Sequence, residues 1–195
     1  MTDNVTTEIG ASLTARGVVL QPITESDYPG LRRLELGERM LHHWRFGGHT
    51  PSPERYAQIL WDGVYSQYII VERSEQARPV GFVMLYDVDL VHGWGYLGAA
   101  RFMDGVMGSA LFIEGFAAFL DLSFKLAPLR KVYFEVPEYN LDTFQSAIGP
   151  LLEVEGVLRE HRFFASQLWD VHVLAIRRDN WEEYIERFRE RMELG

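Results

Sequence analysis

Short apolar runs alternate with polar turns along most of the chain and predict a sheet of several strands. Residues 131–137 illustrate the pattern: Val132, Phe134 and Val136 alternate with Lys131 and Glu135, which is the period of a strand with one buried face. The other runs are similarly short, rich in β-branched residues and bounded by turn residues. The predicted strands span residues 17–23, 67–72, 79–87, 94–102, 131–137, 157–166 and 169–177.

Apolar residues at helical spacing predict helices between these strands. Thr24 to Asp27 and Pro51 to Glu54 supply the capping and acidic residues with which helices begin. The segment 108–127 is apolar on nearly every side, so we expect most of its surface to be buried. Gly149 and Pro150 should bend or break the helix in which they lie. The predicted helices span residues 24–36, 51–64, 108–127, 141–155 and 181–192.

The order of these elements, β α α β β β α β α β β α, predicts an α/β fold. Hairpin strands followed by strand–helix–strand units indicate a mixed sheet with helices on both faces. A length of 195 residues suits a single domain. Residues 1–15 are polar, and we expect them to form a flexible N-terminal arm before a single domain over residues 16–195.

Charge and cysteine content exclude several classes of function. A formal net charge of −9 argues against a general nucleic-acid binder, which needs a surplus of Lys and Arg. The chain has no cysteine, which excludes disulfides, thiolate nucleophiles and Cys-based metal sites. Glu114, Asp121 and Lys125 interrupt the most apolar stretch, so we interpret it as a core helix rather than a membrane span. With no signal peptide in the N-terminal stretch, we expect a cytoplasmic protein.

Two groups of residues between the predicted elements leave alternatives open. His42, His43 and His49 do not have the spacing of metal ligands, and we expect no metal site but a loop or acceptor-pocket role. The large aromatic residues of this part of the chain fit either the wall of an acceptor cleft or the core. They are Trp44, Trp61, Tyr65 and Trp94.

Several segments carry a resemblance to a known superfamily. They are Val18–Asp27, Glu155–His161, Trp169–His172 and Arg178–Trp181, which are similar in sequence and order to the opening, the sixth strand and the last strand of that group. The chain resembles the GNAT superfamily of N-acetyltransferases, closest to the branch of the ribosomal-protein alanine acetyltransferases. The resemblance implies a GNAT-like, mostly antiparallel central sheet that splays between its fourth and fifth strands.

The resemblance also implies an acyl-CoA-dependent N-acyltransferase. Such an enzyme moves an acyl group, here most simply acetyl, to a primary amine of a small molecule or a peptide N-terminus. The lack of cysteine fits direct transfer in a ternary complex, because there is no thiol for an acyl-enzyme. The partners implied are a CoA thioester and an amine acceptor, without nucleic acid, membrane or metal, and the expected assemblies include a homodimer.

In this superfamily the loop between the fourth strand and the following helix holds the pyrophosphate of CoA. Backbone N–H groups and the helix N-terminus suit that task. In this chain Met103 stands where Arg or Gln is usual, Val106 where Gly is usual, and Asp104 adds an anion. The CoA-binding positions implied by the resemblance are Phe102, Met103, Gly105, Val106, Met107, Gly108, Ser109, Ala110, Asn140 and Thr143.

The usual acid and base of the superfamily are missing from their common positions. Tyr96 stands where a strand Glu is common, and Ala147 stands where a Tyr is common. We assign Asn140 to positioning the thioester and Tyr96 to protonating the leaving thiolate, and leave the base to bulk water or the substrate's own ionisation. Glu135 is the next candidate if neither assignment holds. Each also fits a plain structural role, as a turn and cap residue, a core aromatic and a solvated carboxylate. The alternative function is therefore a GNAT-fold binding or regulatory protein that has lost catalysis.

Overall fold

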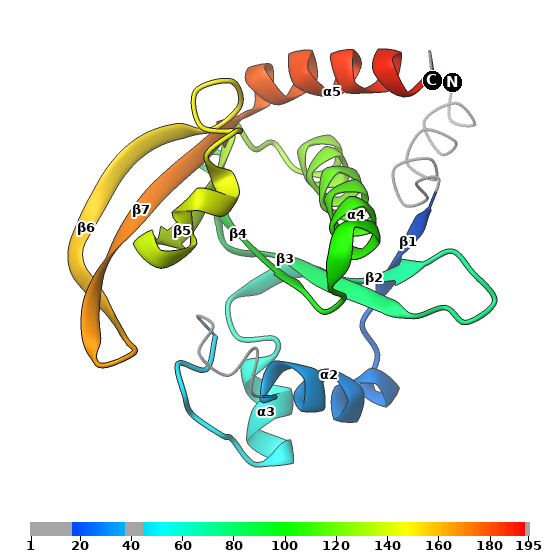
Figure 1. The fold of residues 1–195 in the computed structure, drawn as a ribbon, viewed down its shortest axis with the longest axis vertical. Coiled ribbons are helices and arrows are strands. Elements are labelled where there is room, and N and C mark those ends of the chain that lie inside the picture. The colour runs from blue at the N-terminus through cyan, green and yellow to red at the C-terminus, as the bar shows by residue number, and fades with distance from the viewer. Residues whose placement is uncertain (1–16, 38–44, 194–195) are drawn as a thin grey trace.

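The computed structural model describes residues 17–37 and 45–193, and their side chains as far as residue 187. The described residues form a seven-stranded mixed sheet in the order β1-β2-β3-β4-β5-β7-β6 (Figure 1). Every neighbouring pair is antiparallel except β4 and β5, which run parallel. The predicted α/β class and mixed sheet are confirmed. The strands are β1 (Val18–Pro22), β2 (Val64–Glu72), β3 (Pro79–Asp89), β4 (Trp94–Arg101), β5 (Lys131–Pro137), β6 (Glu153–Phe164) and β7 (Gln167–Arg177).

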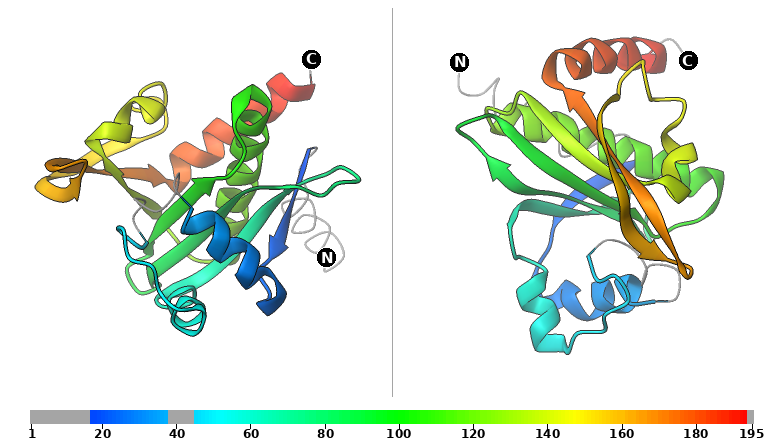
Figure 2. Two further views of the ribbon diagram at one scale, coloured as in Figure 1. Left: turned by 60° about the horizontal axis from the view of Figure 1, so that its bottom comes forward. Right: turned by 90° about the vertical axis from the view of Figure 1, so that its left-hand side faces the viewer.

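Helices cover both faces of this sheet (Figures 1 and 2). The long helix α4 packs on one face, where α5 contacts both α4 and β7, and α2 and α3 lie on the other face. Alternation along the strands explains the two layers: on β3, Val83 and Leu85 join the core under α4, whereas Phe82 and Met84 face the opposite side. The helices are η1 (Glu25–Asp27), α2 (Tyr28–Glu35), α3 (Pro53–Ile59), α4 (Gly105–Leu126), η2 (Glu138–Phe144) and α5 (Arg178–Glu193).

The helix α4 is only half buried, so the prediction that most of its surface would be covered is wrong. Its second half, from Phe119 to Phe124, is buried on the sheet. Its first half is open, with Val106 89%, Met107 64% and Ile113 57% exposed. One side of this half still packs on the sheet, where Phe112 lies against Gly81 of β3.

By length and composition α4 could cross a membrane, with a mean hydropathy of 1.5 in its most apolar window. Core helices of soluble proteins meet the same criterion, so this alone is weak evidence. In the structure α4 contacts β1, β2, β3 and β4, and Gly115 lets it approach Ile70 closely. Asp121 and Lys125, which interrupt its apolar sequence, form an ion pair of 3.0 Å.

The predicted helix over residues 141–155 is wrong. The 3₁₀ helix η2 ends at Phe144, turns follow, and β6 already begins at Glu153. Gly149 adopts φ = 94°, a left-handed conformation that suits glycine and ends any helix there. Smaller shifts affect other elements: α3 ends at Ile59, and Val64, predicted in that helix, begins β2.

Candidate functional site

The sheet opens between β4 and β5. These strands pair over only three positions, Trp94 with Lys131, Gly95 with Val132, and Tyr96 with Tyr133. Beyond Tyr96, β4 pairs only with β3, and beyond Tyr133, β5 pairs only with β7. The two strands therefore separate toward their carboxyl ends, and the splay expected from the sequence is confirmed.

The first turn of α4 lies at the edge of this opening. The chain leaves β4 at Arg101 and enters α4 at Gly105, whose φ of 81° is a conformation that favours glycine. The N–H groups of Gly105, Val106 and Met107 have no acceptor within the helix, because the first turn of any helix lacks one. These groups carry the partial positive charge of the helix N-terminus and could hold an anion such as a pyrophosphate.

The other predicted loop residues shape this turn from within. The N–H groups of Phe102 and Met103 both donate to the carbonyl oxygen of Val80, at 2.8 and 3.2 Å. Gly108 is buried, and a β-carbon on it would lie 2.7 Å from the carbonyl oxygen of Met103. Gly108 therefore lets the preceding loop pack against the helix.

Among the residues predicted to bind the pyrophosphate, only the first three of α4 consequently have N–H groups without an acceptor inside the helix. Gly108, Ser109 and Ala110 lie inside the helix, where N–H groups bond to carbonyls four residues back. The side chain of Phe102 packs against Phe82 at 5.8 Å and belongs to the layer opposite α4. Contact of these residues with CoA remains a prediction from the resemblance.

A basic residue that the sequence analysis missed lies beside the first turn. Arg101, the last residue of β4, donates a hydrogen bond to the hydroxyl of Ser109, which in turn donates to the carbonyl oxygen of Gly105 at 3.0 Å. The guanidinium group thus sits at the N-terminus of α4, where a phosphate would meet both charge and N–H donors. Its position as the nearest basic residue before the glycine-containing loop was the signal available in the sequence.

Asn140 and Thr143 lie together in η2, directly after β5. The Thr143 hydroxyl donates to the Asn140 side-chain oxygen at 3.1 Å. The predicted capping of a helix over 141–155 by Asn140 is wrong, since that helix is absent and Pro137 precedes η2 as its cap residue. Both residues stand beyond the carboxyl end of β5, the strand that forms one side of the opening.

Tyr96 lies at the other end of the opening, so the two proposed catalytic residues are apart. Tyr96 is opposite Tyr133, and the end of β5 at Pro137 lies four residue steps beyond Tyr133, about 13 Å of strand. Among the described contacts, no hydrogen bond joins Tyr96 to Asn140. Any joint action of the two would have to be through a substrate that spans the opening.

Tyr96 belongs to an aromatic group on the face of the sheet opposite α4. Its ring lies 5.6 Å from that of Tyr86, 6.0 Å from Trp94 and 5.4 Å from Tyr133, measured between centroids. Trp94 thus lies on the face of the sheet opposite α4, and its place in an acceptor cleft stays a prediction. Trp61 is 43% exposed on another part of the chain, and Trp44 lies outside the described residues.

Burial and nearby carboxylates raise the pKa of two tyrosine hydroxyl groups on this face. Burial and then the negative charge of Glu135, with smaller effects of Tyr133 and Asp87, raise the pKa of Tyr96 above its usual value. Burial and then Glu135 also raise the pKa of Tyr86. Both tyrosines therefore stay protonated near neutral pH and can donate hydrogen bonds. Glu135 faces them because it is two residues from Tyr133 on the same side of β5.

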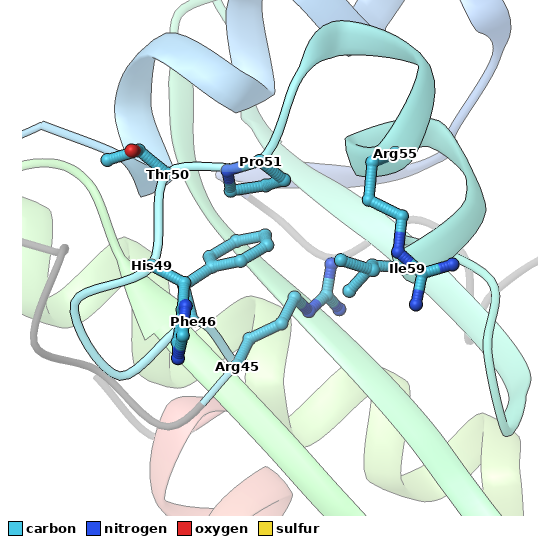
Figure 3. Close-up of a pocket in the computed structure, with 7 residues that line it drawn as sticks. All are labelled: Arg45, Phe46, His49, Thr50, Pro51, Arg55 and Ile59. Carbon is cyan, nitrogen blue, oxygen red and sulfur yellow. The ribbon is translucent and has the colours of Figure 1, made fainter.

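A pocket of about 330 Å³ lies next to this face, between α3 and the loop that precedes it (Figure 3). We call it the Arg45 pocket. Its described lining residues are Arg45, Phe46, His49, Thr50, Pro51, Arg55 and Ile59. His42 and His43, proposed with His49 for an acceptor pocket, lie outside the described residues.

Arg45 joins the pocket to the sheet. Its guanidinium group donates to the sulfur of Met84 at 2.6 Å and lies over the ring of Phe82, 5.1 Å from the centroid. It also lies 3.4 Å from the carboxylate of Glu35, which is buried and accepts a hydrogen bond of 2.5 Å from Tyr56. Burial raises the pKa of Glu35, while Arg45 and Tyr56 oppose that effect.

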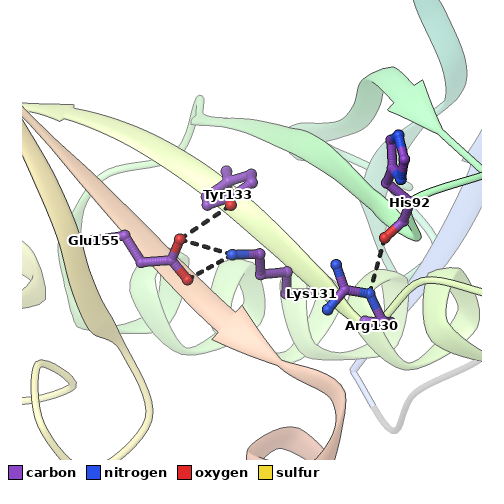
Figure 4. A network of polar contacts seen from close by, with 5 residues as sticks. All are labelled: His92, Arg130, Lys131, Tyr133 and Glu155. Carbon is purple, nitrogen blue, oxygen red and sulfur yellow. Dashed lines mark hydrogen bonds and ion pairs between the residues drawn. The ribbon is translucent and has the colours of Figure 1, made fainter.

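On the other side of the opening, a polar network fastens β5 to β6 (Figure 4). Lys131 contacts both carboxylate oxygens of Glu155, at 2.8 and 2.7 Å, and the Tyr133 hydroxyl donates to the same carboxylate at 3.0 Å. The hydrogen bond from Lys131 is the main reason why the pKa of Glu155 is lowered. Because β7 lies between β5 and β6, this network holds three strands together.

Histidine and carboxylate residues do not gather anywhere in the described parts of the chain. Residues 17–37 and 45–187, the ranges whose side chains are described, contain no group of three or more such side chains placed to hold a metal ion.

Solved structures with the same arrangement of strands and helices are acetyltransferases. Spermidine N-acetyltransferase from Vibrio cholerae, in complex with CoA and spermine, matches with a TM-score of 0.66 and 20% identity over 86% of this chain and 99% of its own. The chain has the GNAT fold. A chimera of that enzyme with hSSAT gives a TM-score of 0.66 and 18% identity, with the same coverage. A point mutant of it gives 0.68 and 18%, over 86% of this chain and 97% of its own.

Comparisons of sequence alone give no relative. No protein-family model matches the chain, and no curated protein matches it. At 18–20% identity, the structural similarity shows the fold and leaves the reaction to be argued from the residues.

Proposed function

We propose that the protein is an acyl-CoA-dependent N-acyltransferase that transfers an acetyl group to a primary amine. The observation that carries the proposal is the opening between β4 and β5, with the first turn of α4 and Arg101 at its edge. An opening of this kind gives an extended thioester a path through the sheet, and the helix N-terminus with Arg101 suits its phosphates.

Acetyl-CoA would supply a thioester whose carbonyl carbon an uncharged amine can attack. The C–N bond then forms, the C–S bond breaks, and the amine loses a proton while the thiolate gains one. Tyr96 is the proton donor that we assign to the thiolate, since its raised pKa keeps it protonated. Glu135, whose charge acts on Tyr96, is the group that we assign to the amine proton.

Asn140 is assigned to orienting the donor. It stands beyond the carboxyl end of β5, and its side chain is held by Thr143 at 3.1 Å. A fixed amide near the opening can bond the amide groups of the pantetheine arm and so hold the thioester in line for attack.

The acceptor class is open between two kinds of amine. The sequence resemblance favours a peptide N-terminus, as in the ribosomal-protein alanine acetyltransferases, whereas a solved structural relative was crystallised with spermine. The alternative of a binding protein without catalysis is favoured by the departures from the superfamily pattern, Met103 and Val106 in the loop before α4, and Tyr96 and Ala147 where Glu and Tyr are common.

Two measurements test the proposal. Calorimetry and thermal unfolding with CoA and acetyl-CoA should show stabilisation, since a ligand specific for the native state raises its apparent stability. Release of the free thiol from acetyl-CoA, with mass spectrometry of a panel of amines and peptides, should show transfer. Tight CoA binding without transfer to any amine would favour the binding protein, and no CoA binding would contradict both functions.

A further inference from the structure

The Arg45 pocket has a charge opposite to that of the whole chain. The chain has a formal net charge of −9, yet three of the residues lining the pocket are Arg45, His49 and Arg55. None of its described lining residues is a carboxylate. The excess of basic residues is therefore local, and the guanidinium groups of Arg45 and Arg55 lie on either side of Ile59 (Figure 3).

Glu35 balances only part of this charge. It lies behind the pocket rather than on its wall, 3.4 Å from Arg45, and fixes the guanidinium group together with Met84. Arg55 is exposed and donates to the neutral side chain of Gln58 at 3.0 Å, so its charge is not cancelled by that contact. Arg55 therefore leaves the described wall net positive, and the imidazole of His49 adds a polar group beside it.

Apart from Thr50, the remaining described wall is apolar. The pocket is completed by Phe46, Pro51 and Ile59, and the ring of Phe46 stacks on buried Tyr56 at a centroid distance of 5.6 Å. A volume of about 330 Å³ is at the small end of the range for ligand pockets, which suits a molecule the size of an amino acid.

The pocket and the aromatic group lie on one face of the sheet. Arg45 contacts Met84, and Tyr86 is two residues further along β3 on the same side, about 7 Å away. Near Tyr86 and Tyr96 the charged groups are the carboxylates of Glu135 and Asp87, with Arg162 also acting on Tyr86. One face thus carries a largely acidic, aromatic region that suits an amine and, beside it, a basic pocket that suits an anion.

We infer that the acceptor carries a carboxylate or a phosphate in addition to its amine, and that the Arg45 pocket binds this anionic group. The inference rests on the proposed function and names the substrate class of that site. Arg55 and His49 would pair with the anion, Arg45 would offer its fixed guanidinium group, and Phe46 and Ile59 would contact the carbon skeleton. Polyamines, which carry only positive charges, would be disfavoured in this pocket.

Matched pairs of amines test the inference through specificity. Phenylalanine with phenethylamine and leucine with isopentylamine differ by a carboxylate, while phosphoethanolamine with ethanolamine differs by a phosphate. We expect kcat/KM to favour the anionic member of at least one pair by about tenfold or more, because a site built around a polar group rejects the analogue that lacks it. The pair showing the preference identifies the anion.

Substitutions in the Arg45 pocket test whether this pocket causes the preference for the anionic amine. Arg55→Gln and His49→Gln, both at exposed positions, should each reduce the ratio of kcat/KM within the preferred pair by about threefold to tenfold. Arg33→Gln is the control, because Arg33 is an exposed arginine of α2 that does not line the pocket, and it should leave the ratio unchanged.

Direct binding separates this inference from the proposed function. Calorimetry of phenylalanine, leucine and phosphoethanolamine with the unliganded protein needs no acyl transfer, and Arg55→Gln should weaken the binding that is seen. Equal kcat/KM within every pair, with transfer intact, would overturn the inference and leave the proposed function standing. If none of the three probes binds, the inference is overturned even when no acyl transfer is detected. If a probe binds but no acyl transfer is detected, only the proposed function is contradicted.

Discussion

Tyr96 and Tyr133 face each other at the last paired position of β4 and β5, with ring centroids 5.4 Å apart. The hydroxyl of Tyr133 donates a hydrogen bond of 3.0 Å to the carboxylate of Glu155. Tyr96, in contrast, stands where the two strands separate, and its hydroxyl is subject to the charge of Glu135. This difference between two neighbouring tyrosines makes their roles separable by experiment.

Tyr96→Phe should lower kcat by about 100-fold with the best amine found, because a proton donor contributes that order of rate. Tyr133→Phe is the matched control and should change kcat little. Both should keep their CoA affinity, measured by calorimetry. Since the pKa of Tyr96 is raised, wild-type kcat should show no loss from its ionisation until the pH rises above the usual range for tyrosine. Full turnover by Tyr96→Phe would show that Tyr96 is not the proton donor to the thiolate.

Arg101→Gln should weaken binding of CoA by about tenfold, since one charge-assisted contact to phosphate is lost. Binding of pantetheine, which has the same arm without the pyrophosphate, should be unaffected. Comparison of the two ligands by calorimetry separates loss of a phosphate contact from damage to the opening. An equal loss for both ligands would show that Arg101 acts through the fold and not on phosphate.

Gly115→Ala should destabilise the protein because the helix lies too close to β2 for a side chain. A β-carbon at Gly115 would be 2.4 Å from the Cγ2 atom of Ile70. Overpacking of this kind costs about 1–3 kcal/mol in urea unfolding. Gly156→Ala is the control, since nothing lies within 4 Å of its β-carbon. The second change Ile70→Ala should recover part of the loss caused by Gly115→Ala, and additive losses would contradict the clash.

The Glu155 network predicts a dependence of stability on pH. The pKa of Glu155 is lowered in the folded protein, so its contribution is present above the unfolded value near 4.3 and is lost as the pH falls through the folded value. Glu155→Gln should therefore cost about 1 kcal/mol of unfolding free energy at pH 7, and this deficit should shrink as the pH falls below the unfolded value toward the folded one. Glu138→Gln, at an exposed position of η2, should show neither effect. A deficit that is constant with pH would exclude the ionic contribution.

The strands could be predicted from the sequence because each carries its own alternation. The predicted range 131–137 coincides with β5, since one face there packs under α4 while the other carries the polar network. The failure over 141–155 has a physical cause. Leu141, Phe144 and Ile148 do face one core, which gives them helical spacing, but they reach it from η2 and from turns ended by Gly149.

The candidate site was less predictable because it depends on where strands stop pairing. The sequence predicted a loop before α4. It could not show that the N–H groups of Phe102 and Met103 donate hydrogen bonds to the carbonyl oxygen of Val80. Nor could it show that Glu135 faces Tyr96, because that follows from the register of β4 with β5. The Arg45 pocket is built from a loop and a short helix whose sequence carries no recognisable motif.

The pairing of β5 has a consequence for the order in which the protein can assemble during synthesis. From β1 to β4, each strand pairs with the next one along the chain, so these strands can join as they leave the ribosome. Strand β5 has three pairs with β4, but it pairs along its full length with β7, residues 167–177. One wall of the opening is thus unsupported until β7 has been made. A nascent chain halted before residue 167 should hold a folded β1–β4 sheet and yet be unable to capture an acyl donor.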